Sequence, residues 1–225
     1  MPINRRFYSL VMRLTLPVLL LRLIWRNRQH SGYRSQIWHR SGFYGRHRAL
    51  RPGGRVLIHA VSVGETLAIA PLRERLLAER QDLSVMVTST TPTGAEQVQQ
   101  KLGGRVEWCW APFDTPGAVG RFLEHWHSTL GALVETEIWP KLLAHAAVRR
   151  VPIVLLNARL SKRSAAGYVS VAGLTRQTLG RLAGVAAQTE SDASRLRALG
   201  AADEAVVVTA SLKFALDRNT LREAN

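Results

Sequence analysis

Residues 55–88 read RVLIHAVSVGETLAIAPLRERLLAERQDLSVMVT, and this stretch contains the pattern that decides the fold. An apolar run at 56–61 is followed by a helical pattern near 65–80, and a second apolar run occupies 83–88. Near-continuous apolar strands separated by helices are typical of a parallel sheet that is covered on both faces. The stretch therefore predicts a strand–helix–strand unit of an α/β protein.

The same alternation continues to the end of the chain. Further strands are predicted at 106–110, 131–135, 152–156, 184–188 and 205–209, and further helices near 93–102, 115–127, 137–150, 161–182 and 190–199. With right-handed crossovers this order predicts a doubly wound parallel sheet, a Rossmann-like α/β fold. Ligands of such sheets bind beyond the carboxyl ends of the strands, so the residues that follow each strand are the candidate functional residues.

The composition is that of a globular protein with one unusual property, its charge. The 225 residues are 46% hydrophobic and 21% charged, and their net charge is +15. Residues 1–64 contain twelve arginines and no acid, so they account for +12 of this charge. A single cysteine, Cys109, excludes an intrachain disulfide and a multi-cysteine zinc site. The histidines show no metal-ligand spacing, so no metal site is predicted.

The basic N-terminal arm contains the apolar segment Phe7–Trp25, FYSLVMRLTLPVLLLRLIW. Crossing a bilayer takes roughly 20 apolar residues, and an arginine near the middle of the span costs about 2.5–3.5 kcal/mol. Arg13 and Arg22 lie on opposite sides of a helix, so the segment is not simply amphipathic. We interpret it as an N-terminal membrane anchor, either spanning or shallow. An apolar helix packed on the domain and a nucleic-acid-binding arm are the alternatives.

Ser62, Gly64 and Glu65 follow the first predicted strand. Gly64 allows a tight turn from strand to helix. Glu65 then falls in the first turn of the helix, where it is either a carboxylate favoured by the helix dipole or a general base. From this position alone we expect the helix N-terminus to lower its pKa, unless a bound substrate buries the carboxylate and reverses the shift.

Hydroxyl groups crowd the loop after the second strand, at Thr90, Thr91 and Thr93, and Gly94 follows them as a further candidate binding residue. Exposed amides and hydroxyls at a helix N-terminus can bind phosphate. The structural alternative is a capping box formed by Thr93 and Glu96.

Charged residues also follow the later strands. Glu135 and Glu137 follow the fourth strand; one of them is a candidate cap for the next helix, and we expect Glu135 to face the same cleft as Glu65. Arg159, after the fifth strand, is either an anion clamp or the partner of a glutamate at this edge. Lys213, after the last strand, is placed to reach a negatively charged group.

Together these segments form a recognisable set of motifs in a fixed order. The set HAVSVGE, TSTTPTGAE, VETEIWP, NARLS, AQTESD and SLKF resembles the 3-deoxy-D-manno-octulosonic acid (Kdo) transferases of Gram-negative bacteria. The resemblance implies a GT-B glycosyltransferase of two Rossmann-like halves. The N-terminal half binds the lipid acceptor, and the C-terminal half binds the nucleotide sugar CMP-Kdo.

The same resemblance implies an inverting transfer of Kdo from CMP to a hydroxyl of the lipid A precursor (lipid IVA), without a metal or another cofactor. Glu65 matches the catalytic base of the family, and Glu135 and Lys213 match positions that stabilise the transition state. Ser62, Gly64, Thr90, Thr91, Thr93, Gly94 and Arg159 are the candidate substrate-binding residues. The implied location is the cytoplasmic side of the inner membrane, with anionic membrane lipids as partners and no nucleic acid.

The resemblance also predicts the domain limits. We expect residues 1–50 to form the membrane-anchoring arm, 51–217 the acceptor-binding domain and 218–225 the start of an interdomain linker, with the donor domain absent. Where the family reads GNLKFD, residues 210–215 read ASLKFA. The 225-residue chain alone is therefore expected to be inactive. A non-catalytic module that binds phospholipid or lipid A is the alternative function.

Overall fold

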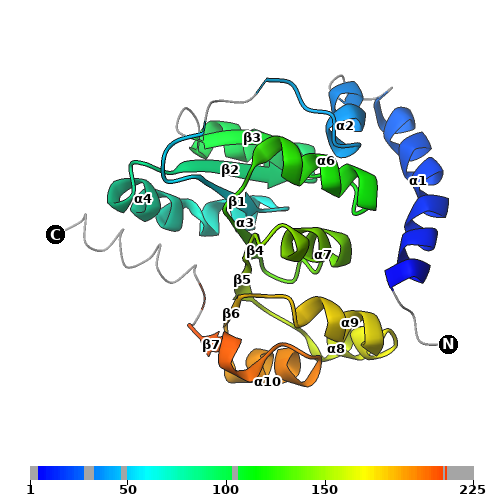
Figure 1. Ribbon diagram of the computed structural model, residues 1–225, viewed down its shortest axis with the longest axis vertical. Helices are drawn as coiled ribbons and strands as arrows, with labels where there is room; N and C mark the ends of the chain where they lie inside the picture. The colour runs from blue at the N-terminus through cyan, green and yellow to red at the C-terminus, as the bar shows by residue number, and fades with distance from the viewer. Residues whose placement is uncertain (1–4, 28–32, 47–49, 103–105, 210, 212–225) are drawn as a thin grey trace.

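The computed structural model of the protein describes residues 5–27, 33–46, 50–102, 106–209 and 211. Seven parallel strands form one sheet in the order β3-β2-β1-β4-β5-β6-β7 (Figure 1). The strands are β1 (Arg55–His59), β2 (Ser84–Ser89), β3 (Val106–Trp110), β4 (Leu130–Val134), β5 (Ile153–Ala158), β6 (Gly184–Ala187) and β7 (Val206–Val208). All seven correspond to predicted strands, so the doubly wound parallel fold is confirmed.

Helices cover both faces of this sheet. Figure 1 shows α3 and α4 on one side and α6, α7 and α9 on the other. The helices are α1 (Arg5–Asn27), α2 (Tyr33–Arg40), α3 (Val63–Ala68), α4 (Ala70–Glu79), α5 (Pro92–Gln97), α6 (Pro116–Trp126), α7 (Pro140–Val148), α8 (Lys162–Val169), α9 (Ala172–Leu179) and α10 (Glu190–Ala198), with a π-helical turn η1 (Val98–Leu102) and a 3-10 turn η2 (Asp203–Ala205).

The central strands supply side chains to two separate cores. In β1, Val56 and Ile58 pack in a cluster with Ile69 on the α3–α4 side. Leu57, between them, packs in the other cluster with Phe122 of α6. Successive side chains of a strand point to opposite faces, so a strand with apolar residues at every position is buried on both sides. This explains why the strands read as continuous apolar runs.

Three predicted helices are shorter or divided in the structure. The helix predicted near 65–80 is divided at Ile69 into α3 and α4, and the one near 161–182 is divided at Ser170 and Val171 into α8 and α9. The helix predicted near 137–150 begins only at Pro140. The residue before a proline avoids the helical conformation, and Trp139 accordingly has extended dihedral angles.

The apolar segment of the arm is helical, as α1, and lies beside the helices of the α6–α7–α9 face (Figure 1). Tyr8, Met12, Leu16 and Leu20 are half-buried and recur at the spacing of one helix face. The Tyr8 hydroxyl donates a hydrogen bond of 2.9 Å to the carboxylate of Asp114. One face of α1 therefore packs on the rest of the structure, while the rest of the helix surface is exposed.

Candidate active site

The site expected at the carboxyl edge of the sheet lies where the direction of sheet growth reverses. β2 and β3 extend the sheet on one side of β1, whereas β5, β6 and β7 extend it in the opposite direction from β4. β1 and β4 are neighbours, with His59 opposite Leu133. The helices that follow these two strands pack on different faces, because Ile69 and Leu142 belong to different cores. Open α/β sheets bind their ligands in the crevice at such a switch point.

Glu65 lies at this switch point, in the first turn of α3 after β1, and is held by its own turn. Its side chain is mostly enclosed, and the residue is 6% exposed. The Val61 amide donates to Oε2 at 2.8 Å, and the Ser62 hydroxyl donates to Oε1 at 2.8 Å. Ser62 also caps α3 by accepting a hydrogen bond from the Glu65 amide at 3.2 Å. These bonds fix the orientation of the carboxylate before any substrate binds.

The pKa of Glu65 is raised, which corrects the expectation drawn from its place at a helix N-terminus. Burial is the largest cause of the raised pKa. The hydrogen bonds from Val61 and Ser62 oppose it, and the negative charges of Glu135 and Glu137 raise it further. A carboxylate with a raised pKa is a stronger base in its ionised form, so burial suits Glu65 to accept a proton.

Glu135 directly follows β4 and has an unusual backbone conformation. Its φ is 62°, in the left-handed region, and its amide donates to the Leu156 carbonyl at 2.9 Å. A residue other than glycine held in this region costs of order 1–3 kcal/mol, and such strain is concentrated at functional sites. The turn places the Glu135 carboxylate close enough to Glu65 for their charges to interact.

Glu137, predicted only as a possible helix cap, forms a group of carboxylates with Glu65 and Glu135. The Trp139 indole donates to Oε2 at 2.7 Å, and His59 Nε2 lies 3.8 Å from the same oxygen. Burial acts to raise the pKa of Glu137, but His59 and Trp139 outweigh it and lower the pKa. Neighbouring carboxylates whose pKa values are shifted in opposite directions can divide acid and base roles.

His59 is buried in β1 and contacts Thr88, Trp139 and Glu137. Its Nδ1 lies 2.8 Å from the Thr88 hydroxyl, and its ring packs edge-on against Trp139 with centroids 4.7 Å apart. The sequence could not reveal these contacts, because the predicted strand runs to residue 61 and places His59 inside it, whereas β1 ends at His59.

The threonine-rich loop after β2 is bonded to the loop of Glu65. Thr91, and not Thr93, caps the following helix, because its hydroxyl accepts from the Gly94 amide at 3.2 Å. The same hydroxyl donates to the Val61 carbonyl at 2.9 Å. A Cβ on Gly94 would lie 2.8 Å from that carbonyl, so only glycine allows this close approach. The capping box predicted for Thr93 is therefore wrong.

The other candidate binding residues are placed less closely. Thr90 accepts a hydrogen bond from Arg40 through its carbonyl, and Thr93 is exposed. The Arg159 side chain is exposed, and its carbonyl accepts a hydrogen bond from Thr136 of the β4–α7 loop. Lys213 lies outside the described residues. Among the residues that the structure describes, no group of three or more His, Cys, Asp or Glu is placed to hold a metal ion.

Asp114 caps α7, although Glu135 and Glu137 were the candidates. Its two carboxylate oxygens accept from the amides of Lys141 at 3.0 Å and Leu142 at 2.9 Å. Burial raises the pKa of Asp114, and these two bonds and the Tyr8 hydroxyl oppose that effect. Asp114 thus connects α1 to the end of the loop that carries Glu135 and Glu137.

Comparison with known proteins decides the family. The model of the family "3-Deoxy-D-manno-octulosonic-acid transferase (kdotransferase)" matches residues 35–216. The chain belongs to the Kdo transferase family. It is 33% identical over 215 residues to a Kdo transferase of Haemophilus influenzae and 38% identical over 221 residues to one of Bordetella pertussis. These matches cover 96% and 94% of the chain but 50% of each relative, so the chain spans about half the length of these Kdo transferases.

Solved structures with the same fold are more distant. A putative UDP-N-acetylglucosamine 2-epimerase from Listeria monocytogenes has a TM-score of 0.53 at 12% identity, over 69% of this chain and 44% of that one. A UDP-bound MnaA from S. aureus has a TM-score of 0.52 at 14% identity, over 71% of this chain and 45% of that one. At these identities the likeness shows the fold alone: this Kdo transferase chain forms one Rossmann-like half of a GT-B architecture.

Proposed function

We propose that this chain is the acceptor-binding half of a Kdo transferase that moves Kdo from CMP-Kdo to lipid IVA. The observation that carries the proposal is the buried Glu65 carboxylate beside Glu135 and Glu137 at the switch point. Family membership supports the reaction class, and the geometry supports the division of roles.

In the proposed reaction, Glu65 accepts the proton of the acceptor hydroxyl as its oxygen attacks the anomeric carbon of Kdo. The new carbon–oxygen bond forms on one face as the bond to the CMP phosphate breaks on the other, which inverts the configuration and needs no metal or other cofactor. CMP leaves as the phosphate anion. Glu135 orients the acceptor, and Lys213 neutralises the charge that develops on the leaving phosphate.

The preorganised carboxylate favours catalysis by Glu65 over a purely structural role. Ser62 and Val61 hold both carboxylate oxygens, so little rearrangement is needed when the hydroxyl arrives. Burial raises the pKa of Glu65, which increases the driving force for proton transfer to its carboxylate.

We further propose that α1 anchors the enzyme to the cytoplasmic side of the inner membrane. Phe7–Trp25 spans 19 residues with mean hydropathy 1.7, so by length and composition this helix could cross a membrane. Basic residues beside an apolar segment are attracted to anionic lipid at about 1 kcal/mol each. The arginines that flank the apolar segment, Arg5, Arg6, Arg26 and Arg28, supply that attraction.

The test is transfer from CMP-Kdo to lipid IVA by the full-length enzyme, with Glu65→Gln and Glu65→Ala. Both variants should lose about 10²–10⁴-fold in kcat, the usual contribution of a general base. Glu79→Gln is the matched control, because Glu79 ends α4, away from the carboxyl edge, and forms an exposed i,i+4 pair with Arg75. Wild-type rates in both Glu65 variants would refute the assignment of the base.

A further inference from the structure

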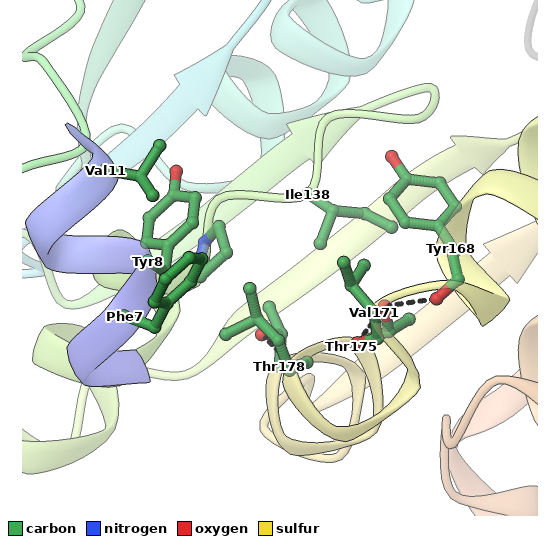
Figure 2. Close-up of a pocket in the computed structure, with 10 residues that line it drawn as sticks. Phe7, Tyr8, Val11, Ile138, Tyr168, Val171, Thr175 and Thr178 are labelled. Carbon is green, nitrogen blue, oxygen red and sulfur yellow. Dashed lines mark hydrogen bonds between the residues drawn. The ribbon is translucent and has the colours of Figure 1, made fainter. Parts of the chain in front are cut away.

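A cavity of about 320 Å³ lies between α1 and the α8–α9 pair, outside the group of carboxylates. Figure 2 shows Phe7, Tyr8 and Val11 of α1 on one side and Val171, Thr175 and Thr178 on the other. The hydroxyls of Thr175 and Thr178 donate to backbone carbonyls of their own segment, at 3.1 Å and 2.6 Å. The wall formed by α9 is therefore apolar in effect.

One wall of the cavity is the loop that carries the candidate catalytic residues. Ile138, in the same β4–α7 loop as Glu137, lines it, and so does Pro140, the first residue of α7. Tyr168 lines it as well. Burial raises the pKa of the Tyr168 hydroxyl, and the negative charge of Glu137 raises it further, so this phenol is within electrostatic reach of Glu137. An apolar group in the cavity would thus end close to the carboxylates.

The opposite side of the cavity meets an exposed apolar stripe of α1. Eight large apolar residues of α1 are more than a third exposed, and two of them, Phe7 and Val11, also line the cavity. The eight are Phe7, Leu10, Val11, Leu14, Val18, Leu21, Ile24 and Trp25. Exposed apolar surface of this extent marks a contact with protein or lipid. The cavity is therefore continuous with the surface that the proposed anchor turns to the membrane.

The charges around the cavity favour an anionic amphiphile. The segments that form its walls come from two stretches without acidic residues, 1–64 and 138–189, and the second contains eight basic residues. The acids within reach of the lining are Asp114, which accepts a hydrogen bond from Tyr8, and Glu137, whose charge acts on Tyr168. On α8 and α9, Lys162, Arg163 and Arg176 are exposed. An acyl chain attached to a phosphorylated head group matches an apolar cavity with basic surroundings.

The volume sets the size of the occupant. Ligand cavities of proteins begin at about 300 Å³. The volume is at the lower end of this range, which suits a single acyl chain.

We propose that this cavity binds one acyl chain of the acceptor lipid and so positions the acceptor hydroxyl beside Glu65. The inference rests on the proposed function and adds to it a subsite for the lipid part of the substrate. The acyl chain moves from an apolar membrane to an apolar cavity, so little hydrophobic free energy is gained. The effect of the cavity is therefore to position the acceptor.

The experiment fills the cavity and compares two acceptors of the full-length enzyme. Val171→Trp introduces an indole into the α9 wall, and Val11→Trp does the same from α1. Val169→Trp is the matched control, because Val169 is 60% exposed and does not line the cavity. The acceptors are lipid IVA and the same bis-phosphorylated disaccharide with its acyl chains removed.

Each cavity variant should lower kcat/KM for lipid IVA at least about tenfold, since small misplacements of a substrate have large effects on rate. Their kcat/KM for the deacylated acceptor should stay within about twofold of the wild type, as should both values for Val169→Trp. An equal loss with both acceptors, or no loss in either cavity variant, would overturn the inference.

A direct measurement separates this inference from the proposed function. A twelve-carbon fatty acid with a terminal diazirine should label 168–178 in the wild type and in Val169→Trp but not in Val171→Trp. Lipid IVA should compete with this label, whereas competition by bilayer phospholipid alone would overturn the choice of occupant. Labelling without any Kdo transfer by the wild-type enzyme would refute the proposed function and leave an acyl-binding cavity.

Discussion

Replacement of Asp114 by alanine tests how the structure holds α7 and α1 together. The carboxylate accepts from two amides of α7 and from the Tyr8 hydroxyl. Loss of a helix cap costs about 0.5–2 kcal/mol, and a buried donor left without a partner costs about 1–3 kcal/mol. Removal of a buried carboxylate offsets part of this loss, since burial raises the pKa of Asp114. We therefore expect Asp114→Ala to lower the free energy of unfolding by about 3 kcal/mol.

The assay is urea unfolding of the chain in nonionic detergent, with hydrogen exchange at the amides of Lys141 and Leu142. Asp203→Ala is the control, because its side chain is 87% exposed, and its effect should stay within about 0.5 kcal/mol. Tyr8→Phe should cost about 1 kcal/mol alone and nothing further in the absence of Asp114. If Asp114→Ala matches its control, or if the two amides keep their protection, the cap described above is not what stabilises α7.

Three further predictions follow from the site and the core. The pKa of Glu65 should lie above 4.5, and it should fall in Glu135→Gln because one neighbouring negative charge is lost. NMR titration of the Glu65 carboxyl measures the pKa in both proteins. An unchanged pKa in the variant would show that the two groups do not interact. Gly94→Ala should cost about 1–3 kcal/mol of stability and lower activity, since its Cβ would meet the Val61 carbonyl at 2.8 Å. Gly167→Ala, whose Cβ would meet nothing within 4 Å, should stabilise the chain by up to about 1 kcal/mol. Equal melting temperatures of the two variants would contradict this prediction. Arg55→Met should lower the free energy of unfolding, measured with a chemical denaturant, by about 3–5 kcal/mol, because a fully buried guanidinium 2.9 Å from Glu107 is lost. A decrease below about 1 kcal/mol would refute the importance of this pair.

Local patterns were sufficient for the turn from β1 to α3, whose interacting residues are close in the sequence. The cap of α3 joins Ser62 to Glu65, three residues apart, and the turn with its glycine is visible in the motif. The cap of α7 could not be predicted in this way, because Asp114 precedes Lys141 by 27 residues. The nearer glutamates were the natural choice, but Pro140 delays the start of the helix and leaves them in the loop.

The sign of the pKa shift at Glu65 also required the tertiary structure. A helix N-terminus is a local feature and predicts a lowered pKa, whereas burial depends on every element that covers the side chain. Burial proves to be the larger influence. The same holds for His59, whose burial was predictable from its strand but whose approach to Glu137 depends on the adjacent strand β4.

The sequence by itself determined the alternation of strands and helices, the basic arm and the set of polar residues at the strand ends, because each depends on short-range periodicity or composition. Only the tertiary structure decided that β1 and β4 pair across more than seventy residues, which brings Glu65 to Glu135 and Glu137. It also decided that α1 packs against α9 around a cavity. Strand order and helix docking are set by the fit of apolar faces over the whole chain, and no local stretch of sequence contains that information.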